Sequence, residues 1–539
     1  MSAVIHRLSE ALANQIAAGE VVQRPASVVK ELMENAVDAG SNHVRVFLKD
    51  AGKSLIQVVD DGYGMSALDA VACFDRHATS KISKIEDLFN IHTMGFRGEA
   101  MASIASVARV ELKTRMAEEE MGTKVIMDAS ALMMNQDCQT AVGTSVAVKN
   151  LFYNVPARRN FLKSNTVEMR RIIEEFQRVA LAYPELFFSL DHNGIELFHL
   201  KQSNMRQRVV AVLGKQSNEK LVPVEEQTTV LNLTGFAGKP DGARKSRGEQ
   251  YFFINKRFFK SGYLHHAVTS LYEDLIPEKH HPLYVLFLDI DPERIDINVH
   301  PTKQEVKFED EKIIYTFIQA AVRHALARFS AMPSLDFSLD TGIANLAAFS
   351  RPATASGTQH LLEGKTFKFQ GSSYNQDAAQ MKKSSSGDQP WEALFEVSKS
   401  KKEEPPQTLT IASDLEEGLD DSDVIEPVQL HRRYIMSPIK SGFLLLDQQA
   451  AHERILFEHY LKSLAAGPIP SQRQLFPSTI ELSPSDANIL MEILEDIRAL
   501  GFDVQPFGDN AFVVHGLPPD CGDIDGKTAI DEFLEAYRG

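Results

Sequence analysis

Cysteine and tryptophan are scarce in this chain of 539 residues. It has one tryptophan, Trp391, and three widely separated cysteines, Cys73, Cys138 and Cys521. The cysteines form no Cys-x-x-Cys pair, which argues against a disulfide framework and against a self-contained zinc module. Long apolar runs are missing too, so the sequence predicts neither secretion nor a membrane-spanning helix. We therefore expect a protein of the reducing cytoplasm.

A P-loop is also absent. The sequence has no Gly-x-x-x-x-Gly-Lys-Ser/Thr segment, so a nucleotide site in this chain needs another phosphate binder. The length and a hydrophobic content of 43% are sufficient for several domains, each with its own core.

One predicted helix near the N-terminus carries polar residues on a single face. Pro25 suits its first position, and Gly40 suits its end. Glu31, Asn35 and Asp38 recur between them at helical spacing. A carboxylate can accept a proton from an attacking water, and a carboxamide oxygen one turn away can hold a hard cation such as Mg²⁺. The alternative is an ordinary surface helix with its polar stripe facing water.

Two predicted strands and a glycine-rich turn follow this helix. The strands cover residues 44–48 and 55–59, and the second ends directly at Asp60. Gly62 and Gly64 come next and allow the backbone to approach a ligand closely. An aspartate on such a turn is able to read the edge of a purine. Helix, strand and glycine turn in this order favour a nucleotide site over a plain hairpin.

Two further segments carry candidate phosphate ligands. Gly95 and Gly98 precede a small-residue run, 101–106, that reads as a helix. Free amides at a helix N-terminus suit phosphate oxygens, although a helix cap and a turn would look the same. Far downstream, Lys303 follows a predicted strand and is able to reach a terminal phosphate, the alternative being a solvated loop lysine.

Several long motifs together resemble the MutL family of DNA mismatch repair proteins. They are Asn14 to Val22, Asp38 to Gly40, Arg76 to Lys81, Gly95 to Ala100, Phe152 to Arg159 and Asn298 to Lys303. Motifs of this length, spread over about the first three hundred residues, make chance similarity a weak competitor.

The resemblance implies a GHKL-type ATPase related to type II topoisomerases, Hsp90 chaperones and histidine kinases, with ATP and Mg²⁺ as cofactors. It makes Glu31 the general base, Asn35 the Mg²⁺ ligand and Asp60 the adenine-binding carboxylate. The other ATP-binding residues that it implies are Gly62, Gly64, Thr79, Lys81, Gly95, Phe96, Arg97, Gly98, Thr144 and Lys303.

The expected fold class is α/β, built from α+β sandwiches in four parts. They are a GHKL (Bergerat-type) ATPase domain over 1–205, a second domain similar to ribosomal protein S5 over 206–330, a disordered linker over 331–425 and a small α/β dimerisation domain over 426–539. The linker is rich in Ser, Gln, Gly and charged residues. In the last part, 442–447 reads as a buried strand, and 450–464 and 485–500 as helices. Whether residue 539 is the natural end stays open.

A basic cluster lies in the expected second domain. Although the net charge of the chain is −16, local basic patches govern contact with phosphates. We expect weakly sequence-specific binding to the DNA backbone rather than a solvated loop, with contacts from Lys245, Arg247, Arg257 and Lys260. Lys256 stands where the family usually has a glycine, which alters that turn.

Two short motifs lie in the C-terminal part. Gln472, Leu475 and Phe476 have the form of peptides that dock on the replication sliding clamp, the alternatives being a strand edge or a weaker clamp peptide at 407–411. Asp447, Glu453 and Glu458 keep the carboxylates of an endonuclease motif found in many MutL proteins. The motif histidine is Gln449, however, and an amide is a poor ligand for a transition metal. No later Cys-Pro-His segment occurs. We expect a vestigial site, unless a metal-site segment is missing from this chain.

The resemblance therefore predicts a mismatch repair matchmaker: a slow, Mg-dependent ATPase that dimerises, clamps DNA and couples mismatch recognition to later repair factors. Expected partners are DNA, the mismatch-recognition protein MutS, the sliding clamp and a second copy of the chain, at the bacterial nucleoid and away from membranes. The rival class is another GHKL ATPase. A topoisomerase would need a cleavage domain, and a chaperone would lack both the motif at 152–159 and the basic second domain.

Overall fold

The computed structural model describes two stretches of the chain. The first is 18–329 without 83, 85–92, 96, 229–230, 246 and 297–305, and the second is 427–538 without 440–441, 509 and 523. The chain divides into a unit of Met1–Ser350 with His459–Gly539 and a unit of Arg351–Glu458. Lys303, Phe96, Trp391, the expected linker and the weaker clamp peptide lie outside the described residues.

An eight-stranded sheet organises the N-terminal part. Its order is β5-β4-β3-β6-β2-β1-β7-β8. The strands are β1 (His43–Lys49), β2 (Leu55–Asp60), β3 (Arg109–Arg115), β4 (Gly122–Asp128), β5 (Ala131–Cys138), β6 (Gly143–Lys149), β7 (Phe187–His192) and β8 (Ile195–Leu200). Along β1, Val44, Val46 and Leu48 are buried while Arg45 and Lys49 are exposed. This alternation gives the sheet one face toward a core and one toward water.

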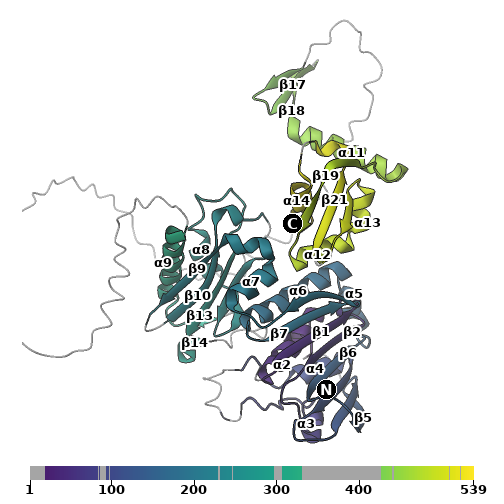
Figure 1. Cartoon of the computed structure of the whole chain (residues 1–539), viewed down its shortest axis with the longest axis vertical. Coiled ribbons are helices and arrows are strands. Elements are labelled where there is room, and N and C mark those ends of the chain that lie inside the picture. Colours follow the sequence, from purple (N-terminus) through teal and green to yellow (C-terminus); the bar gives the residue numbers. More distant parts are fainter. Residues whose placement is uncertain are drawn as a thin grey trace, which may run out of the picture. The chain divides into compact units, whose positions relative to one another are not determined.

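Helices cover the buried face of this sheet. Helix α2 (Pro25–Asp38) contacts β1 and β2, α4 (Ala100–Val107) contacts β3 and β4, and α6 (Asn165–Ala182) packs on α2 (Figure 1). The short helices α3 (Ala67–Ala72) and α5 (Pro156–Phe161) lie in the connections.

Helix α2 has the predicted boundaries. Pro25 occupies its first turn, and Gly40, just beyond its end, has a φ of +67°, a conformation that glycine adopts without strain. Val28, Val29 and Leu32 are buried on the opposite side from the polar stripe. The stripe is therefore free to face a ligand, and the predicted strands at 44–48 and 55–59 are also confirmed as the antiparallel pair β1 and β2.

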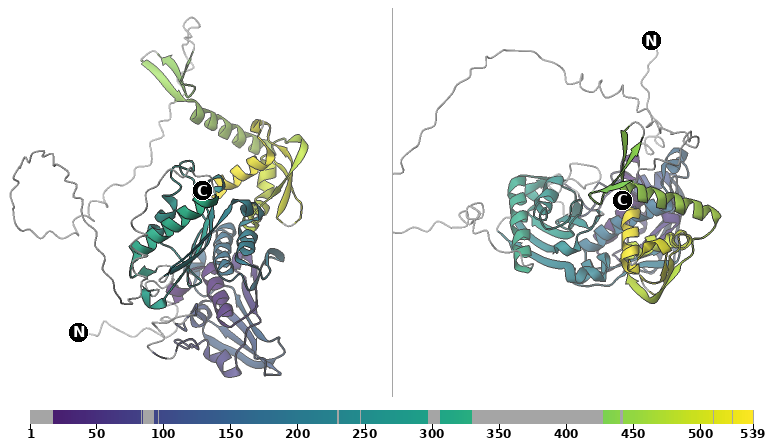
Figure 2. Two further views of the ribbon diagram at one scale, coloured as in Figure 1. Left: turned by 60° about the vertical axis from the view of Figure 1, so that its left-hand side comes forward. Right: turned by 90° about the horizontal axis from the view of Figure 1, so that it is seen from above.

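The next part is a five-stranded sheet in the order β12-β11-β13-β10-β9. Its elements are α7 (Met205–Leu213), β9 (Leu221–Gln227), β10 (Leu231–Gly238), β11 (Gln250–Ile254), β12 (Arg257–Phe259), α8 (Gly262–Thr269), β13 (Tyr284–Ile290), β14 (Ile295–Asp296), β15 (Lys307–Phe308) and α9 (Glu311–Phe329). Helix α9 contacts α8, β9 and β10, and it lies beside this sheet in both views of Figure 2. The core between them includes Leu233, Leu286, Ile318 and Val322.

The hairpin between β11 and β12 turns on two residues in left-handed conformations. Asn255 has a φ of 47° and Lys256 a φ of 67°. A two-residue turn of this kind strongly favours glycine at its second position. Lys256 thus carries the strain of a left-handed conformation, and its Nζ lies 2.6 Å from Glu185 Oε1.

A fully buried arginine ties α7 to the end of α6. Arg208 is 1% exposed, and its guanidinium donates to four backbone carbonyls, those of Ala180, Pro184, Leu186 and Lys201. The last carbonyls of a helix have no partner within the helix, and Ala180 lies in the final turn of α6. Burial lowers the pKa of Arg208 to about 10, so it stays a cation at neutral pH.

The C-terminal stretch holds two small sheets. In the unit Arg351–Glu458, β16 (Val428–Leu430), β17 (Tyr434–Ile439) and β18 (Gly442–Asp447) form an antiparallel sheet that leads into α11 (Gln448–Ala466). In the other unit, the sheet β19-β21-β20 packs with three helices. Its elements are β19 (Gln472–Glu481), α12 (Pro484–Glu492), α13 (Leu494–Ala499), β20 (Asp503–Pro506), β21 (Ala511–Leu517) and α14 (Gly526–Arg538).

Two expectations for this stretch need correction. The helix predicted over 485–500 is two helices, because the backbone leaves helical geometry at Ile493 (φ −99°, ψ 9°). The strand predicted to be buried, β18, is exposed in the single chain, with Phe443 65% and Leu445 49% accessible.

Among the described residues, no helix is long and apolar enough to cross a membrane.

Candidate nucleotide site

A large cavity opens beside α2 and the central strands. Its volume is about 660 Å³, within the range usual for sites that bind a nucleotide-sized ligand. Segments far apart in the chain converge on it, from α2, β2, the turn after β2, residues 77–81, the loop before α4, and β6. The predicted residues that line it are Glu31, Asn35, Asp60, Gly64, Thr79, Lys81, Gly95, Arg97, Gly98 and Thr144.

Asp60 lies at the cavity wall formed by β2 and β6. Its Oδ1 accepts the amide of Gly62 at 2.9 Å and the amide of Thr144 at 3.2 Å. Burial raises the pKa of Asp60 to about 6; the two amides oppose this rise, while the neighbouring Asp61 adds to it. Because these two bonds fix its orientation, the carboxylate accepts a hydrogen bond from a ligand amino group in one direction only. The edge of adenine carries such an amino group.

The two glycines after β2 are required for a reason other than the predicted close approach of the backbone to a ligand. A Cβ at Gly62 would lie 2.6 Å from the carbonyl oxygen of Ala39, and one at Gly64 would lie 2.2 Å from that of Arg115. Gly62 does not line the cavity. Close packing against the protein's own backbone therefore requires both glycines, and Gly62 acts on the site through the amide that orients Asp60.

Asn35 faces a cation in this structure. Lys81 Nζ lies 2.9 Å from Asn35 Oδ1 and 2.5 Å from Asp38 Oδ2. The carboxylate of Asp38 also accepts the amides of Met94 at 2.8 Å and Gly95 at 3.0 Å. Oxygen donors that attract an ammonium group also suit Mg²⁺, so this end of the cavity fits a divalent ion and the phosphates it accompanies.

Asp38 is a site residue whose role the sequence did not predict. It joins the polar face of α2 to the loop that starts at Gly95, a contact spanning more than fifty residues of sequence. Its helical spacing after Glu31 and Asn35 was the available signal. The adjoining loop is also tightly built: a Cβ at Gly98 would lie 2.4 Å from the carbonyl oxygen of Ala78.

Glu31 reaches the cavity from the same helix face. Its Oε1 lies 3.3 Å from Nζ of Lys30, and Oε1 of Glu34 lies 3.2 Å from the same nitrogen. Glu34 is buried, with 6% of its surface exposed. The sequence carries no separate signal for Lys30 or Glu34, because both fall in the polar stripe of an ordinary amphipathic helix.

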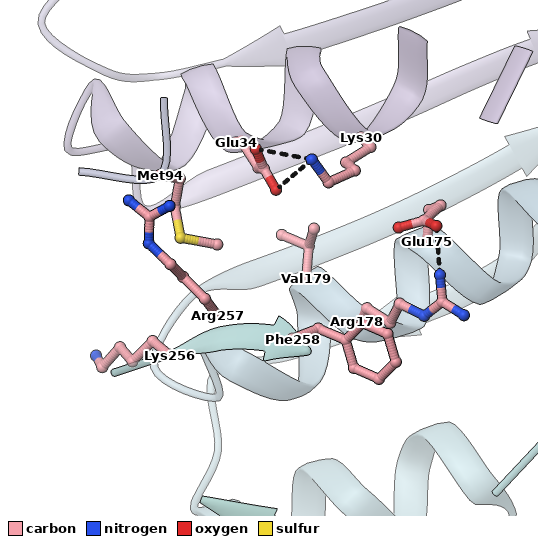
Figure 3. A pocket seen from close by; sticks show the side chains of 9 residues that line it. All are labelled: Lys30, Glu34, Met94, Glu175, Arg178, Val179, Lys256, Arg257 and Phe258. Carbon is pink, nitrogen blue, oxygen red and sulfur yellow. Dashed lines mark hydrogen bonds and ion pairs between the residues drawn. The ribbon is translucent and has the colours of Figure 1, made fainter. Parts of the chain in front are cut away.

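The structure corrects the role predicted for Arg257. Only 6% of this residue is exposed, and its guanidinium donates to the carbonyl of Thr93, close to the loop that starts at Gly95. Figure 3 shows it in a small pocket with Glu34 and Met94. Burial lowers the pKa of Arg257, and the carboxylates of Glu34 and Asp38 counteract that. A guanidinium enclosed in this way is not available to a DNA backbone and instead joins β12 to the ATPase part.

The other predicted DNA contacts are accessible. Lys245, Arg247 and Lys260 are exposed. Arg247 Nε lies 3.3 Å from Nε2 of His281, and this contact leaves its two terminal nitrogens for other partners.

The carboxylates of the nuclease motif already have local partners. Asp447 Oδ1 accepts the amides of Gln449 at 3.0 Å and Ala450 at 3.2 Å, which caps the start of α11. Gln449 Nε2 donates to Glu453 at 3.0 Å. Glu458 accepts from Arg454 at 2.8 Å. In the part of the chain that the structure describes, no three His, Cys, Asp or Glu side chains are grouped to hold a metal ion.

The clamp motif occupies the start of β19. Leu475 is 87% exposed and Phe476 81% exposed. The pairing of β19 with β21 shifts register between Arg473 and Ser478. This irregularity turns two adjacent large apolar side chains toward water, which a regular strand would not do.

Known families match three segments of the chain. A model of the histidine kinase-, DNA gyrase B- and HSP90-like ATPases matches residues 23–146. One of a DNA mismatch repair protein C-terminal domain matches residues 209–327, and one of the MutL C-terminal dimerisation domain matches residues 428–539.

Individual relatives are similar over nearly the whole chain. The DNA mismatch repair protein MutL of Flavobacterium psychrophilum is 44% identical, covering 99% of this chain and 88% of its own length. The MutL of Christiangramia forsetii is also 44% identical, covering 100% of this chain and 88% of its own length. A crystal structure of the N-terminal domain of a DNA repair protein, 22% identical with a TM-score of 0.52, covers 59% of this chain and 98% of that one, and shows the shared fold.

These matches confirm the resemblance and the fold class expected from the sequence. The identities are high and extend through the ATPase part, the second sheet and the dimerisation domain. The chain therefore belongs to the MutL family of DNA mismatch repair proteins, with a GHKL-type ATPase domain and a C-terminal dimerisation domain.

Proposed function

We propose that this chain is an ATP-dependent mismatch repair matchmaker whose slow, Mg-dependent ATPase opens and closes a dimeric clamp on DNA. One observation carries the proposal: Glu31 and Asn35 of α2, Asp60 at the end of β2 and Lys81 of a later loop converge on a single cavity. Each supplies a different requirement of ATP chemistry, namely a base, a metal ligand, a purine reader and a cation for phosphate.

The cavity accommodates ATP in one direction. Asp60, held by the amides of Gly62 and Thr144, accepts the adenine amino group. The phosphates then extend toward Asn35, Lys81 and the amides at the N-terminus of α4, where a helix dipole favours anions. Asn35 would hold Mg²⁺, which supplies neutralisation of phosphate charge when bound.

Hydrolysis needs one proton transfer that Glu31 is placed to perform. A water attacks the terminal phosphorus, a new P–O bond forms, and the bond to the β-phosphate oxygen breaks. The proton of the attacking water passes to the Glu31 carboxylate, and ADP and phosphate leave. The carboxylate needs only to orient and deprotonate water, so its loss affects turnover more than binding.

Surfaces outside the cavity support the proposed partners. The exposed cations Lys245, Arg247 and Lys260 suit weakly sequence-specific contact with DNA phosphates. The accessible pair Leu475 and Phe476 suits docking on the replication sliding clamp, with Gln472 completing the motif.

The exposed apolar residues of β18 suit coverage by a second copy through the dimerisation domain. Family membership supports MutS as the partner that recognises the mismatch, and the bacterial cytoplasm, at the nucleoid, as the place of action. We do not propose metal-dependent nicking, because Gln449 stands in the place of the motif histidine and the three carboxylates serve the start of α11 and polar contacts along it.

The division of roles in the cavity is tested by two substitutions in the full chain. Glu31→Ala is expected to keep the affinity for Mg-ATP within about threefold while kcat falls by about a hundredfold or more. Asn35→Ala is expected to weaken nucleotide binding by about tenfold or more, because the metal loses its protein ligand. Equilibrium binding and steady-state phosphate release measure both quantities. Equal losses of affinity in the two variants would refute the assigned roles.

A further inference from the structure

Lys30 lies directly behind the proposed catalytic base. Its Nζ is 3.3 Å from Glu31 Oε1 and 3.2 Å from Glu34 Oε1, and its side chain is 16% exposed. Lys30 and Glu34, four residues apart, form an ordinary helical pair. Lys30 and Glu31 do not, because neighbouring residues on a helix point about 100° apart and normally miss each other. The lysine therefore bends across the helix to bring one ammonium group to two carboxylates.

The ammonium group is enclosed on its other side. It borders a pocket of about 30 Å³, which also contacts Glu175, Arg257 and Phe258 (Figure 3). That volume is of the order of a single water molecule. Burial by itself lowers the pKa of Lys30, but the carboxylates of Glu34, Glu31 and Glu175 outweigh burial and raise it. Lys30 is consequently a permanent cation with little room to move.

Glu31 and Lys30 thus belong to two adjoining spaces. Glu31 lines the nucleotide cavity, and Lys30 lines the small pocket behind it. A general base works only when its carboxylate is ionised and its oxygen points at the water. A fixed cation at 3.3 Å limits the rotamers that Glu31 adopts and so sets the direction of its carboxylate.

We propose that Lys30, anchored by Glu34, is a positioning residue that holds Glu31 for ATP hydrolysis. This inference rests on the proposed function, since it takes Glu31 as the base. Lys30 does not touch the nucleotide cavity, so its effect on the reaction passes through Glu31. A purely structural lysine would instead affect the stability of α2 and leave the turnover number of the folded protein unchanged.

The test compares Lys30→Met, Lys30→Arg and Lys149→Met in the full chain. Lys30→Met is expected to lower kcat by about 10- to 100-fold, the usual effect of losing a partner that orients a catalytic group, with ATP affinity within about twofold. Lys30→Arg keeps the charge and should restore most of kcat. Lys149 also pairs with a glutamate, Glu111 at 2.8 Å, but on the open face of the sheet, so Lys149→Met should leave kcat unchanged.

Several outcomes would overturn the inference. A folded Lys30→Met protein with wild-type kcat would do so, as would a kcat loss that Lys30→Arg fails to relieve. If thermal melting shows that Lys30→Met does not fold, Glu34→Gln decides instead. This variant removes the carboxylate that anchors Lys30 but keeps the positive charge of Lys30. A fall in kcat in Glu34→Gln at unchanged ATP affinity supports the anchor, and an unchanged kcat contradicts it.

A double substitution separates this inference from the proposed function. In a Glu31→Gln background, Lys30→Met should cause no further loss of kcat, because both changes remove the same contribution. If Glu31→Gln itself retains turnover, the assignment of the base fails. If Glu31→Gln loses turnover and Lys30→Met alone does not, only the role of Lys30 fails.

Discussion

Asp60 is a carboxyl group whose surroundings favour the neutral form more than water does. Burial raises its pKa from 3.8 to about 6, while the amides of Gly62 and Thr144 partly stabilise the charge. The folded chain consequently binds the proton more tightly than the unfolded chain does. Asp60 therefore contributes most to the stability of the fold below about pH 4, and this contribution is lost as the pH rises to about 6. Under the proposed function, the polar edge of adenine offsets that loss when ATP binds.

The raised pKa predicts a pH dependence of nucleotide affinity. Below about pH 6, Asp60 becomes protonated and loses its charge-assisted bond, so the Kd for ADP should rise by up to about tenfold per pH unit. Calorimetric titration between pH 5 and 8 measures it. Asp60→Asn should bind weakly at every pH and show no such rise. An identical pH profile in the variant would mean that another group is titrating.

The turn at Lys256 gives a prediction about stability. Lys256→Gly should raise the thermal midpoint of unfolding by about 1–3 °C. The left-handed conformation costs a residue with a side chain about 1–2 kcal/mol, and glycine avoids this cost. The lost pair with Glu185 is exposed and contributes little. Lys256→Ala is the matched control, since it removes the same pair but keeps the strain. A lower midpoint in Lys256→Gly would show that the ion pair outweighs the strain.

At the scale of single elements, β19 has one part that packs in the core and one part that exposes apolar side chains to water. Ile480 near its end is fully buried in the C-terminal core, whereas Leu475 and Phe476 at its beginning are more than 80% exposed. Leu475 and Phe476 lie within the stretch where the register shifts, between Arg473 and Ser478, and Ile480 lies in the regular pairing beyond it. One strand is thus able to hold the domain together and present a docking peptide.

This arrangement predicts a clean loss of clamp binding. Replacing Leu475 and Phe476 with alanine should abolish capture by the purified sliding clamp without changing ATPase activity or the melting temperature, because both side chains are exposed. Phe507→Ala is the matched control, since Phe507 is also a well-exposed apolar residue of this domain, at 66%. Undiminished capture by the double variant would place the clamp contact elsewhere or exclude it.

The elements that the sequence predicted best are those with local signals. Pro25 and Gly40 mark α2, and alternating residues mark β1 and β2, so their positions follow from neighbours in the sequence. The break at Ile493 was missed because the apolar periodicity continues through it. Periodicity describes which face is buried and says little about a local change in backbone angle.

The site was predictable in its motifs and not in its supporting contacts. The site residues of α2 and β2 were predictable from their spacing in the sequence and from the resemblance to the family. The enclosed positions of Lys30 and Arg257, by contrast, depend on what packs against them from other elements. A basic residue in a basic cluster looks accessible in the sequence, and only the tertiary structure shows that Arg257 turns inward to the carbonyl of Thr93.

At the scale of the whole molecule, the ATPase part and the second sheet are joined by buried charged and polar contacts. Arg257 of β12 reaches the loop beside the phosphate end of the cavity, and Tyr251 of β11 lies 3.3 Å from Gln177 of α6. The proposed function therefore predicts that a change in that loop on ATP binding reaches the part that carries the exposed cations through these contacts. Together with the dimerisation domain, this coupling is what an ATP-operated clamp on DNA requires.

Retention on circular DNA tests the clamp most directly. The Glu31→Ala protein should bind ATP without hydrolysing it and so remain closed. With Mg-ATP it should stay on a nicked circular duplex through a high-salt wash and be released when the circle is cut, because phosphate contacts are screened by salt while a ring is not. Without ATP it should wash off at once. Equal loss from circular and linear DNA, or retention that does not depend on ATP, would contradict an ATP-closed ring.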